Sequence, residues 1–302
     1  ALQQLCAINT VMYYSAQILT LAGFADASQA IWLAALVATA NFAFTLAGMA
    51  LIDRAGRRPL TLVSIAGICG ALLLLGGAFW RETERSPPLH AALADAGGCG
   101  DYTRCMPCVE DPACGYCADT PAAAVGACLP ATLGDKRPRG GEGLACDARR
   151  WHPGSCPGAD GWPAVGGLLL YLAFFAPGLG MTPWALNAEM HPPHLRAHAS
   201  AAATAVNWVC NLLVSVTFLD LTRLLGTYGA FWLYAAVAAI GAAYLFLYLP
   251  ETKGRSLEEM GDMFRASGPV VGTPFALPGT GGAPGGEPST PSPSPAAADE
   301  TD

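Results

Sequence analysis

Charged residues are scarce in this chain of 302 residues: only 13% are charged, whereas 53% are hydrophobic. Soluble domains typically carry about 25% charged residues, so this composition argues against an ordinary soluble protein. Most of the charge lies in residues 81–160, in short junctions and in the tail, and the rest consists of long apolar runs typical of membrane proteins. The net charge of −7 comes largely from that loop and tail, so it gives no indication of nucleic-acid binding.

The chain also lacks an initiator methionine and a cleavable signal peptide, because it begins at Ala1 inside an apolar run. We therefore expect the N-terminus to be a truncation. No nucleophile–base pair or metal-ligand constellation stands out in the sequence either. We expect a protein that is not an enzyme and needs no cofactor or metal.

Six apolar stretches are long enough to cross the hydrocarbon core, which takes about 20 helical residues. Each must be helical, or buried where it breaks, because lipid offers the backbone no hydrogen bonds. The sequence therefore predicts an all-α membrane fold, a bundle of six transmembrane helices. The six spans are Leu2–Ala22, Ala30–Ile52, Leu60–Trp80, Ala164–Ala188, Ala199–Leu219 and Gly229–Leu249.

Basic residues in the short junctions predict the orientation of these spans. They follow the second, fourth and sixth spans, whereas the junction after the first has none and that after the fifth has only Arg223. This alternation places those junctions and the tail in the cytoplasm and residues 81–162 outside. The expected organisation is three helices in 1–80, an extracellular loop in 81–162, three helices in 163–250 and a largely disordered cytoplasmic tail in 251–302. The basic residues are Arg54, Arg57, Arg58, Arg196, Lys253, Arg255 and Arg265.

Eight of the 11 cysteines lie in the extracellular loop, where an even count in an oxidising compartment favours four disulfides. Zinc is the alternative, because two CxxC pairs are present, but only five residues separate them, against roughly 15–20 in a zinc ribbon. The sequence leaves the disulfide connectivity open. The eight are Cys99, Cys105, Cys108, Cys114, Cys117, Cys128, Cys146 and Cys156, and the other three lie in spans as buried small hydrophobes.

Polar side chains at membrane depth indicate a cavity, because lipid-facing polar groups are costly. The first span carries Gln3, Gln4 and Asn9. On an unbroken helix Gln4 and Asn9 would point about 140° apart, so they converge on one ligand only if this helix bends. The second span carries Asn41. The fourth breaks at 177–180 and ends at Trp184, and discontinuous helices are where transporters place substrates.

The fifth span carries a stripe of uncharged polar residues at helical spacing, with Trp208 beside it. Amides and hydroxyls suit a neutral polyhydroxylated ligand, and an aromatic face packs on the C–H side of a sugar ring. The alternative is hydrogen bonding between helices, which stays open for the outer serines. For Asn207 and Asn211 the cavity is favoured. The stripe is Ser200, Thr204, Asn207, Asn211 and Ser215.

Three motifs resemble those of sugar porters in the major facilitator superfamily. Asp53-Arg54-Ala55-Gly56-Arg57-Arg58 resembles their D/E-R-x-G-R-R loop. Gln3-Gln4 with the segment 9–14 is similar to their seventh helix, and Pro250-Glu251-Thr252-Lys253-Gly254 to the motif after their twelfth. Residues 175–192 are most similar to proton/myo-inositol symporters, and residues 99–156 resemble the plexin–semaphorin–integrin module that those symporters carry. The chain is thus similar to the C-terminal six-helix half.

The resemblance implies a function, transport of a sugar or cyclic polyol by alternating access, with myo-inositol and proton coupling as the expectation. It implies that Gln3, Gln4, Asn9, Asn41 and Trp184 contact the substrate and that Asn207 and Trp208 line the same cavity. It also implies that Arg57, Arg58, Glu189, Arg196 and Glu251 form salt bridges at a cytoplasmic gate. Ala7 departs from the family, which usually has glycine there.

The resemblance also implies the partners: a small neutral polyol or sugar, the lipid bilayer and a missing N-terminal half that carries the titrating carboxylate. The plasma membrane is the expected location, with a vacuolar or other endomembrane as the alternative. A second functional hypothesis is a membrane-anchored receptor or adhesion protein that acts through its disulfide-rich loop. The intramembrane amides and the gate motif favour the transporter, because an anchor needs neither.

Overall fold

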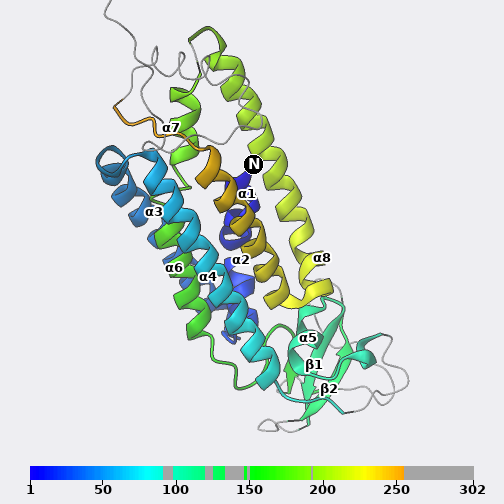
Figure 1. Ribbon diagram of the computed structural model, residues 1–302. Helices are drawn as coiled ribbons and strands as arrows, with labels where there is room; N and C mark the ends of the chain where they lie inside the picture. Colours follow the sequence, from blue (N-terminus) through cyan, green and yellow to red (C-terminus); the bar gives the residue numbers. More distant parts are fainter. Residues whose placement is uncertain (91–97, 120–124, 133–145, 148–149, 192, 255–302) are drawn as a thin grey trace, which may run out of the picture.

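The computed structural model describes residues 1–90, 98–119, 125–132, 146–147, 150–191 and 193–254, and the tail expected to be disordered lies almost wholly outside these residues. Helices form an elongated bundle, and a small disulfide-bonded unit, here called the insert (residues 86–160), sits at one end of it (Figure 1). The opposite end carries α7 and is called the α7 end. The bundle consists of α1 (Leu2–Leu5), α2 (Ile8–Leu21), α3 (Ala27–Ala55), α4 (Arg57–Arg85), α6 (Trp162–Phe175), α7 (Thr182–Glu189) and α8 (Pro193–Tyr248).

Two of the expected spans are broken helices. The first is divided between α1 and α2, because Ala7 adopts a left-handed conformation with φ 72°. The prediction of one stretch from Leu2 to Ala22 therefore needs correction, and the bend on which the polar residues depend is present. The fourth span is divided between α6 and α7, where residues 176–181 carry the expected proline and glycines. Proline lacks an N–H and glycine weakens a helix, so the backbone leaves the helical path there.

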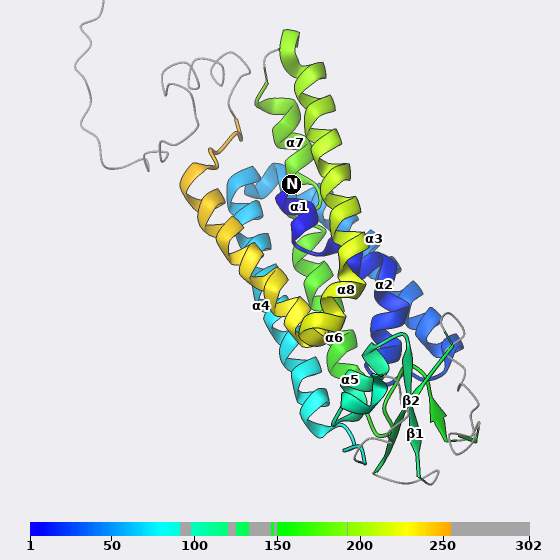
Figure 2. The same ribbon diagram turned by 90° about the vertical axis from the view of Figure 1, so that its right-hand side faces the viewer.

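The short junction expected at 220–228, between the fifth and sixth spans, is helical in the structure. Helix α8 continues to Gly226, whose φ of 73° reverses the chain, and a second helical limb runs back along the first (Figures 1 and 2). Residues 220–228 are therefore helical on both sides of one left-handed glycine. Among the described residues, three helices are long and apolar enough to cross a membrane by length and composition: Ala27–Ala55, Arg57–Arg85 and His194–Tyr248.

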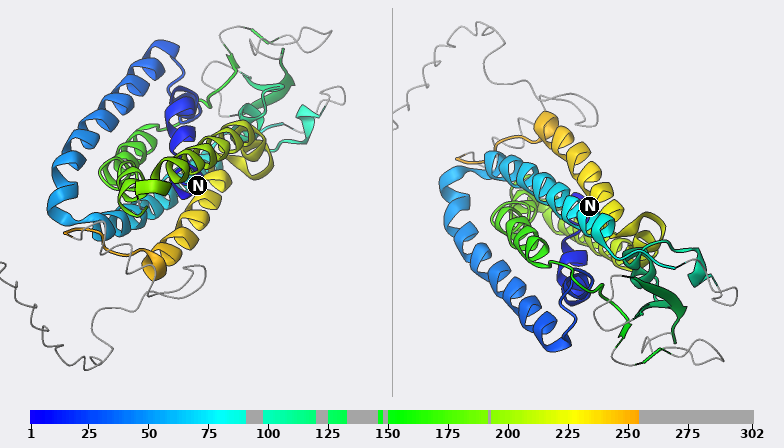
Figure 3. Two further views of the ribbon diagram at one scale, coloured as in Figure 1. Left: turned by 90° about the horizontal axis from the view of Figure 1, so that it is seen from above. Right: turned by 90° about the horizontal axis from the view of Figure 1, so that it is seen from below.

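The buried core lies where α4, α6 and α8 pack together. Phe79 of α4 stacks on Phe231 of α8 with ring centroids 5.7 Å apart, and both rings are almost fully buried. Seen along the bundle, α3 lies apart from both limbs of α8, with α4 and α6 between them (Figure 3). Large apolar side chains such as Trp32 and Leu224 point outward, and this is the pattern of helices surrounded by lipid.

The insert contains three short strands, which the all-α expectation did not include. β1 (Cys114–Ala118) pairs antiparallel with β2 (Gly126–Pro130) on one side and with β3 (Trp151–His152) on the other. A 3-10 turn, η1 (Cys99–Asp101), and helix α5 (Cys105–Glu110) complete it. The insert fully buries Tyr116, Met106 and Val109, and covalent links reinforce this small core.

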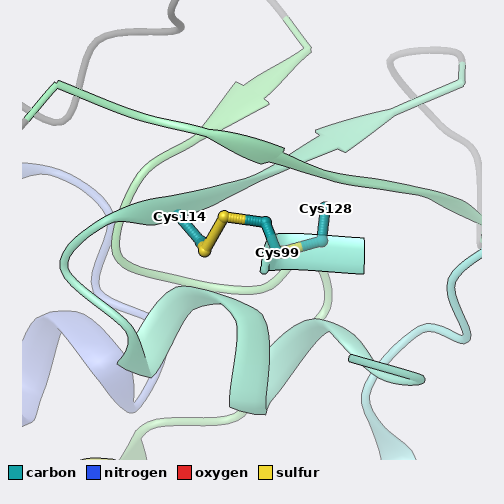
Figure 4. Close-up of side chains that lie close together, drawn as sticks. All are labelled: Cys99, Cys114 and Cys128. Carbon is teal, nitrogen blue, oxygen red and sulfur yellow. A yellow bond between two sulfur atoms is a disulfide. The ribbon is translucent and has the colours of Figure 1, made fainter. Parts of the chain in front are cut away.

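All eight cysteines of the insert form disulfides in the structure. The pairs Cys105–Cys156 and Cys108–Cys128 hold α5, and the pair Cys99–Cys114 joins η1 to β1. Figure 4 shows Cys99 bonded to Cys114 with Cys128 beside them. These three sulfurs lie close together, but each is already bonded to another sulfur, so none is a thiolate that could hold a metal. The fourth pair is Cys117–Cys146.

Candidate functional site

Four amide side chains form one connected network in the middle of the bundle. Asn207 of α8 donates from Nδ2 to Oε1 of Gln3 at 2.8 Å and accepts from Nε2 of Gln4 at 3.0 Å. Asn9 of α2 donates from Nδ2 to Oε1 of Gln4. The residues expected in one cavity, Gln3, Gln4, Asn9 and Asn207, are therefore joined by hydrogen bonds.

The break in the first span brings this network together. Gln4 lies on α1 and Asn9 on α2, and the left-handed Ala7 turns the second helix so that the two amides meet. On a continuous helix they would point about 140° apart. The bend is therefore the local feature that converts a helical sequence into a polar cluster.

Gln3 also reaches the second helix break. Its Nε2 donates to the carbonyls of Leu179 and Gly180, at 3.0 and 2.9 Å. The backbone amide of Leu179 in turn donates to Oγ of Ser64 in α4 at 2.9 Å. The breaks in the first and fourth spans thus lie side by side, and both amide hydrogens of Gln3 are engaged. Among the described residues, Gln4, Asn9 and Asn207 each donate only one of their two amide hydrogens.

A pocket of about 210 Å³ opens beside this network, on its α7 side. Gln3 and Asn207 form its polar inner wall, and Trp184 is about half exposed at its side. Across the pocket floor, the hydroxyls of Thr61 and Thr182 lie 2.8 Å apart. The side chains that line it include none with a charge: Leu2, Gln3, Thr61, Leu179, Thr182, Pro183, Trp184, Leu186, Asn187, Ala203, Asn207 and Leu245, with Ala1.

Five other polar or aromatic candidates are not part of this lining. Gln4 and Asn9 are connected to it only through their hydrogen bonds in the network, and the other three are Asn41, Trp208 and Asn211. Asn41 of α3 is not part of its lining, and its Oδ1 is buried with no hydrogen-bond partner among the described residues. Trp208 points outward with 61% of its surface exposed, so the expectation that it lines the cavity is not met in this structure. Asn211 is buried but its Oδ1 accepts from Ser215 at 3.1 Å, and this bond stays within the helix.

A second polar cluster, the gate cluster, lies at the α7 end and joins the start of α4 to α7 and to residues 251–252. Arg57 donates to Oε1 of Glu189 from both Nη2 and Nε, at 2.9 and 3.2 Å, and Thr252 donates to Oε2 at 2.6 Å. Asp53 adds a weaker, exposed ion pair to Arg57 at 3.4 Å. Of the five residues expected to form salt bridges, Arg57 and Glu189 pair with each other.

Glu251 acts differently from the expectation. Its two carboxylate oxygens accept the backbone amides of Arg57 and Arg58, each at 3.1 Å, so it caps the N-terminus of α4. Gly56 permits this approach, because a side chain there would collide with the carboxylate. Arg58 instead donates to the carbonyl of Phe246 at 2.9 Å. Arg196 donates to the carbonyl of His191 and forms no ion pair with any described residue.

The sequence reasoning missed several residues that build the site. Ser64, Thr61, Thr182 and Tyr171 are buried hydroxyls that bond across helices. In the sequence each appears only as a single hydroxyl in an apolar span. Such hydroxyls are also common where helices pack together, so they do not by themselves indicate a site. Asn187 also lines the pocket, although the sequence indicated it only as part of the motif at 175–192 and not as a site residue.

A model of the family described as "Sugar (and other) transporter" matches residues 1–94 and 159–264. The human proton myo-inositol cotransporter is 40% identical over 274 residues, which cover 87% of this chain and 42% of that protein. The Caenorhabditis elegans proton myo-inositol cotransporter hmit-1.1 is 33% identical over 281 residues, covering 87% of this chain and 46% of that protein. The chain therefore spans less than half the length of these curated relatives.

Among solved structures, the inward-open xylose transporter XylE of E. coli matches with a TM-score of 0.54 and 22% identity. The match covers 87% of this chain and 40% of that one. The same transporter bound to 6-bromo-6-deoxy-D-glucose, described as a major facilitator superfamily proton:xylose symporter, matches with a TM-score of 0.56 at 22% identity. It also covers 87% of this chain and 40% of that one. At this identity the likeness shows a shared fold.

Proposed function

Because this chain belongs to the sugar transporter family, we propose that it forms one half of a transporter that moves a sugar or cyclic polyol by alternating access. The relatives are transporters and not enzymes. The observation that supports the proposal most directly is the uncharged amide network at two adjoining helix breaks. An amide both donates and accepts, and so it matches a hydroxyl, which does the same.

The chemistry of the pocket favours a neutral polyhydroxylated substrate. Asn207 offers a spare amide hydrogen, Gln3 offers its amide oxygen, Thr61 and Thr182 offer hydroxyls, and no charged side chain lines the wall. The ring of Trp184 supplies an apolar face for the C–H side of a sugar or cyclitol ring. We assign Gln4, Asn9 and Asn41 to the same substrate path; Trp208 is then a residue that faces the other half of the transporter or the lipid.

The proposed architecture is the C-terminal six-helix half. The six passes are α1 with α2, α3, α4, α6 with α7, and the two limbs of α8. We place the insert outside the cell and the gate cluster at the cytoplasmic side, as the basic junctions predict. The partners are the bilayer and an N-terminal six-helix half, because alternating access needs two bundles around one site. The plasma membrane is the proposed location.

We propose a cyclic polyol, myo-inositol, as the substrate and proton symport as the mode. The support is the likeness to the human and C. elegans proteins that are named proton myo-inositol cotransporters. The six predicted spans carry no carboxylate at mid-depth. Proton coupling would then depend on a carboxylate in the other half.

Uptake by the full-length protein that contains this chain tests the proposal. Purified protein in liposomes should accumulate labelled myo-inositol when the outside is acidic, and a protonophore should abolish the accumulation. The chain alone should not transport. Absence of uptake for inositol and for hexoses, combined with specific protein binding by the insert, would favour a receptor instead.

A further inference from the structure

Tyr171 is a fully buried tyrosine of α6 that the proposed transport site does not yet explain. Its hydroxyl donates to the backbone carbonyl of Cys6 at 2.8 Å, and neither residue is exposed. Its ring stacks on Phe175, one turn along the same helix, at 5.8 Å and 10°. The ring thus has a packing role in α6, whereas the hydroxyl reaches into the break of the first span.

The carbonyl of Cys6 needs a donor because of that break. In a continuous helix it would accept the amide of Thr10, four residues on. The left-handed Ala7 interrupts this pattern, and within the described residues Cys6 accepts only from Tyr171. An unsatisfied carbonyl at membrane depth costs several kcal/mol, so the hydroxyl replaces a bond that the bend removed.

The hydrogen bond from Tyr171 of the fourth span to the break of the first has a counterpart that runs from the first span to the break of the fourth. Gln3 of α1 donates to the carbonyls of Leu179 and Gly180, which the break between α6 and α7 has freed. A side chain of the fourth span therefore satisfies the break of the first, and a side chain of the first satisfies the break of the fourth.

We propose that Tyr171 is a positioning residue for substrate binding: its bond to Cys6, with the bonds from Gln3 to Leu179 and Gly180, latches the two helix breaks into one unit. This inference rests on the proposed transport function. The latch fixes the angle between α1 and α2, and that angle sets where Gln4 and Asn9 meet. The breaks then move together, because releasing one leaves backbone groups of the other without partners.

The substitution Tyr171→Phe tests the latch, because it removes the hydroxyl and keeps the ring that stacks on Phe175. In the full-length protein, the half-saturating inositol concentration should rise roughly three- to tenfold, the effect of losing one hydrogen bond. Hydrogen–deuterium exchange should rise at residues 6–10 and also at residues 176–181. Tyr244→Phe is the matched control, since it removes a tyrosine hydroxyl from an exposed position on α8.

The exchange at 176–181 separates a latch from simple packing, because Tyr171 bonds only to the other break. Increased exchange confined to residues 6–10, or an unchanged half-saturating concentration, overturns the proposal. If Tyr171→Phe does not fold, Ser64→Ala loosens the amide of Leu179 and should raise exchange at residues 6–10; unchanged exchange there overturns it. A wild type that takes up neither a polyol nor a hexose refutes the transport function, whereas the exchange experiment still decides whether the breaks are coupled.

Discussion

Glu110 of the insert accepts a hydrogen bond from the backbone amide of Thr227 at 3.0 Å, although 117 residues separate them. Thr227 is the first residue after the left-handed Gly226, so its amide opens the second limb of α8. Such amides have no partner within their own helix, and a carboxylate there also favours the positive end of the helix dipole. The insert thereby fastens the turn between the last two helical limbs.

Replacing Glu110 should destabilise this turn. We expect Glu110→Ala to lower the free energy of unfolding by about 1 kcal/mol, the usual cost of a lost helix cap. Glu110→Gln should retain most of the stability, because its amide oxygen still accepts the bond. Thermal denaturation in detergent measures both variants. Asp101→Ala, at an exposed position of the insert, is the control, and an equal loss in that variant would contradict a specific cap.

The left-handed conformation of Ala7 leads to a second prediction about stability. A β-branched side chain is strongly disfavoured at positive φ, whereas glycine is at ease there. We expect Ala7→Val to reduce folded protein at the membrane, with a cost of about 1–2 kcal/mol, and Ala7→Gly to be tolerated. Surface abundance and melting temperature provide the measurement. Equal behaviour of the two variants would show that residue 7 is not left-handed.

These two positions also show what the sequence could and could not predict. The apolar runs and the polar spacing predicted the helices and the stripe that bears Asn207, because helical periodicity is a local property. The sequence showed that Gln4 and Asn9 converge only if the helix bends, but it did not predict the bend at Ala7, because alanine favours a continuous helix. The bond between Glu110 and Thr227 joins distant segments, and no local pattern in the sequence encodes it.

The gate cluster shows the same limit. The family resemblance placed Arg57 and Glu189 in one set of salt-bridging residues, and the structure pairs them with each other. Glu251 could not be distinguished from an ion-pair partner, because a carboxylate that caps backbone amides and one that pairs with arginine look alike in a sequence. The outward direction of Trp208 was missed because its neighbour Asn207 faces inward.

Thiol counting and peptide mapping test the disulfide pattern. Denaturation without reductant should expose three thiols, those of Cys6, Cys69 and Cys210, because the other eight cysteines are bonded. Peptide mapping of the unreduced protein should recover the linkages of Cys99 to Cys114 and of Cys117 to Cys146. Stoichiometric zinc together with additional free thiols would contradict the four disulfides and favour a metal site.

Glu189 should contribute more to stability than Asp53, although both pair with Arg57. The Arg57 side chain is only 17% exposed and Glu189 29%, whereas Asp53 is 79% exposed. Loss of a half-buried charged partner costs roughly 1–3 kcal/mol, and an exposed pair contributes at most about 1. Glu189→Gln should therefore lower the melting temperature clearly and Asp53→Asn hardly at all. The reverse order would show that the cluster is not held by the buried pair.

The last prediction concerns substrate affinity. On the proposal that Gln4 and Asn9 of the amide network hydrogen-bond the substrate, replacing either leaves a substrate hydroxyl unpaired in a desolvated cavity. We expect Gln4→Ala or Asn9→Ala in the full-length protein to cost about 1–3 kcal/mol of binding, or roughly a ten- to hundredfold rise in half-saturating concentration. Trp184→Ala should act in the same direction, because it removes an apolar face.

Asn211→Ala is the matched control for these variants. Asn211 lies on the same polar stripe as Asn207, but its Oδ1 accepts from Ser215 within α8, and it is not one of the four residues of the amide network. Its loss should reduce folded protein and leave the affinity of the surviving molecules normal. Surface abundance and concentration dependence, measured together, separate the two effects. If Gln4, Asn9 and Trp184 variants also kept normal affinity, their side chains would be contacts between helices, and the substrate site would lie elsewhere.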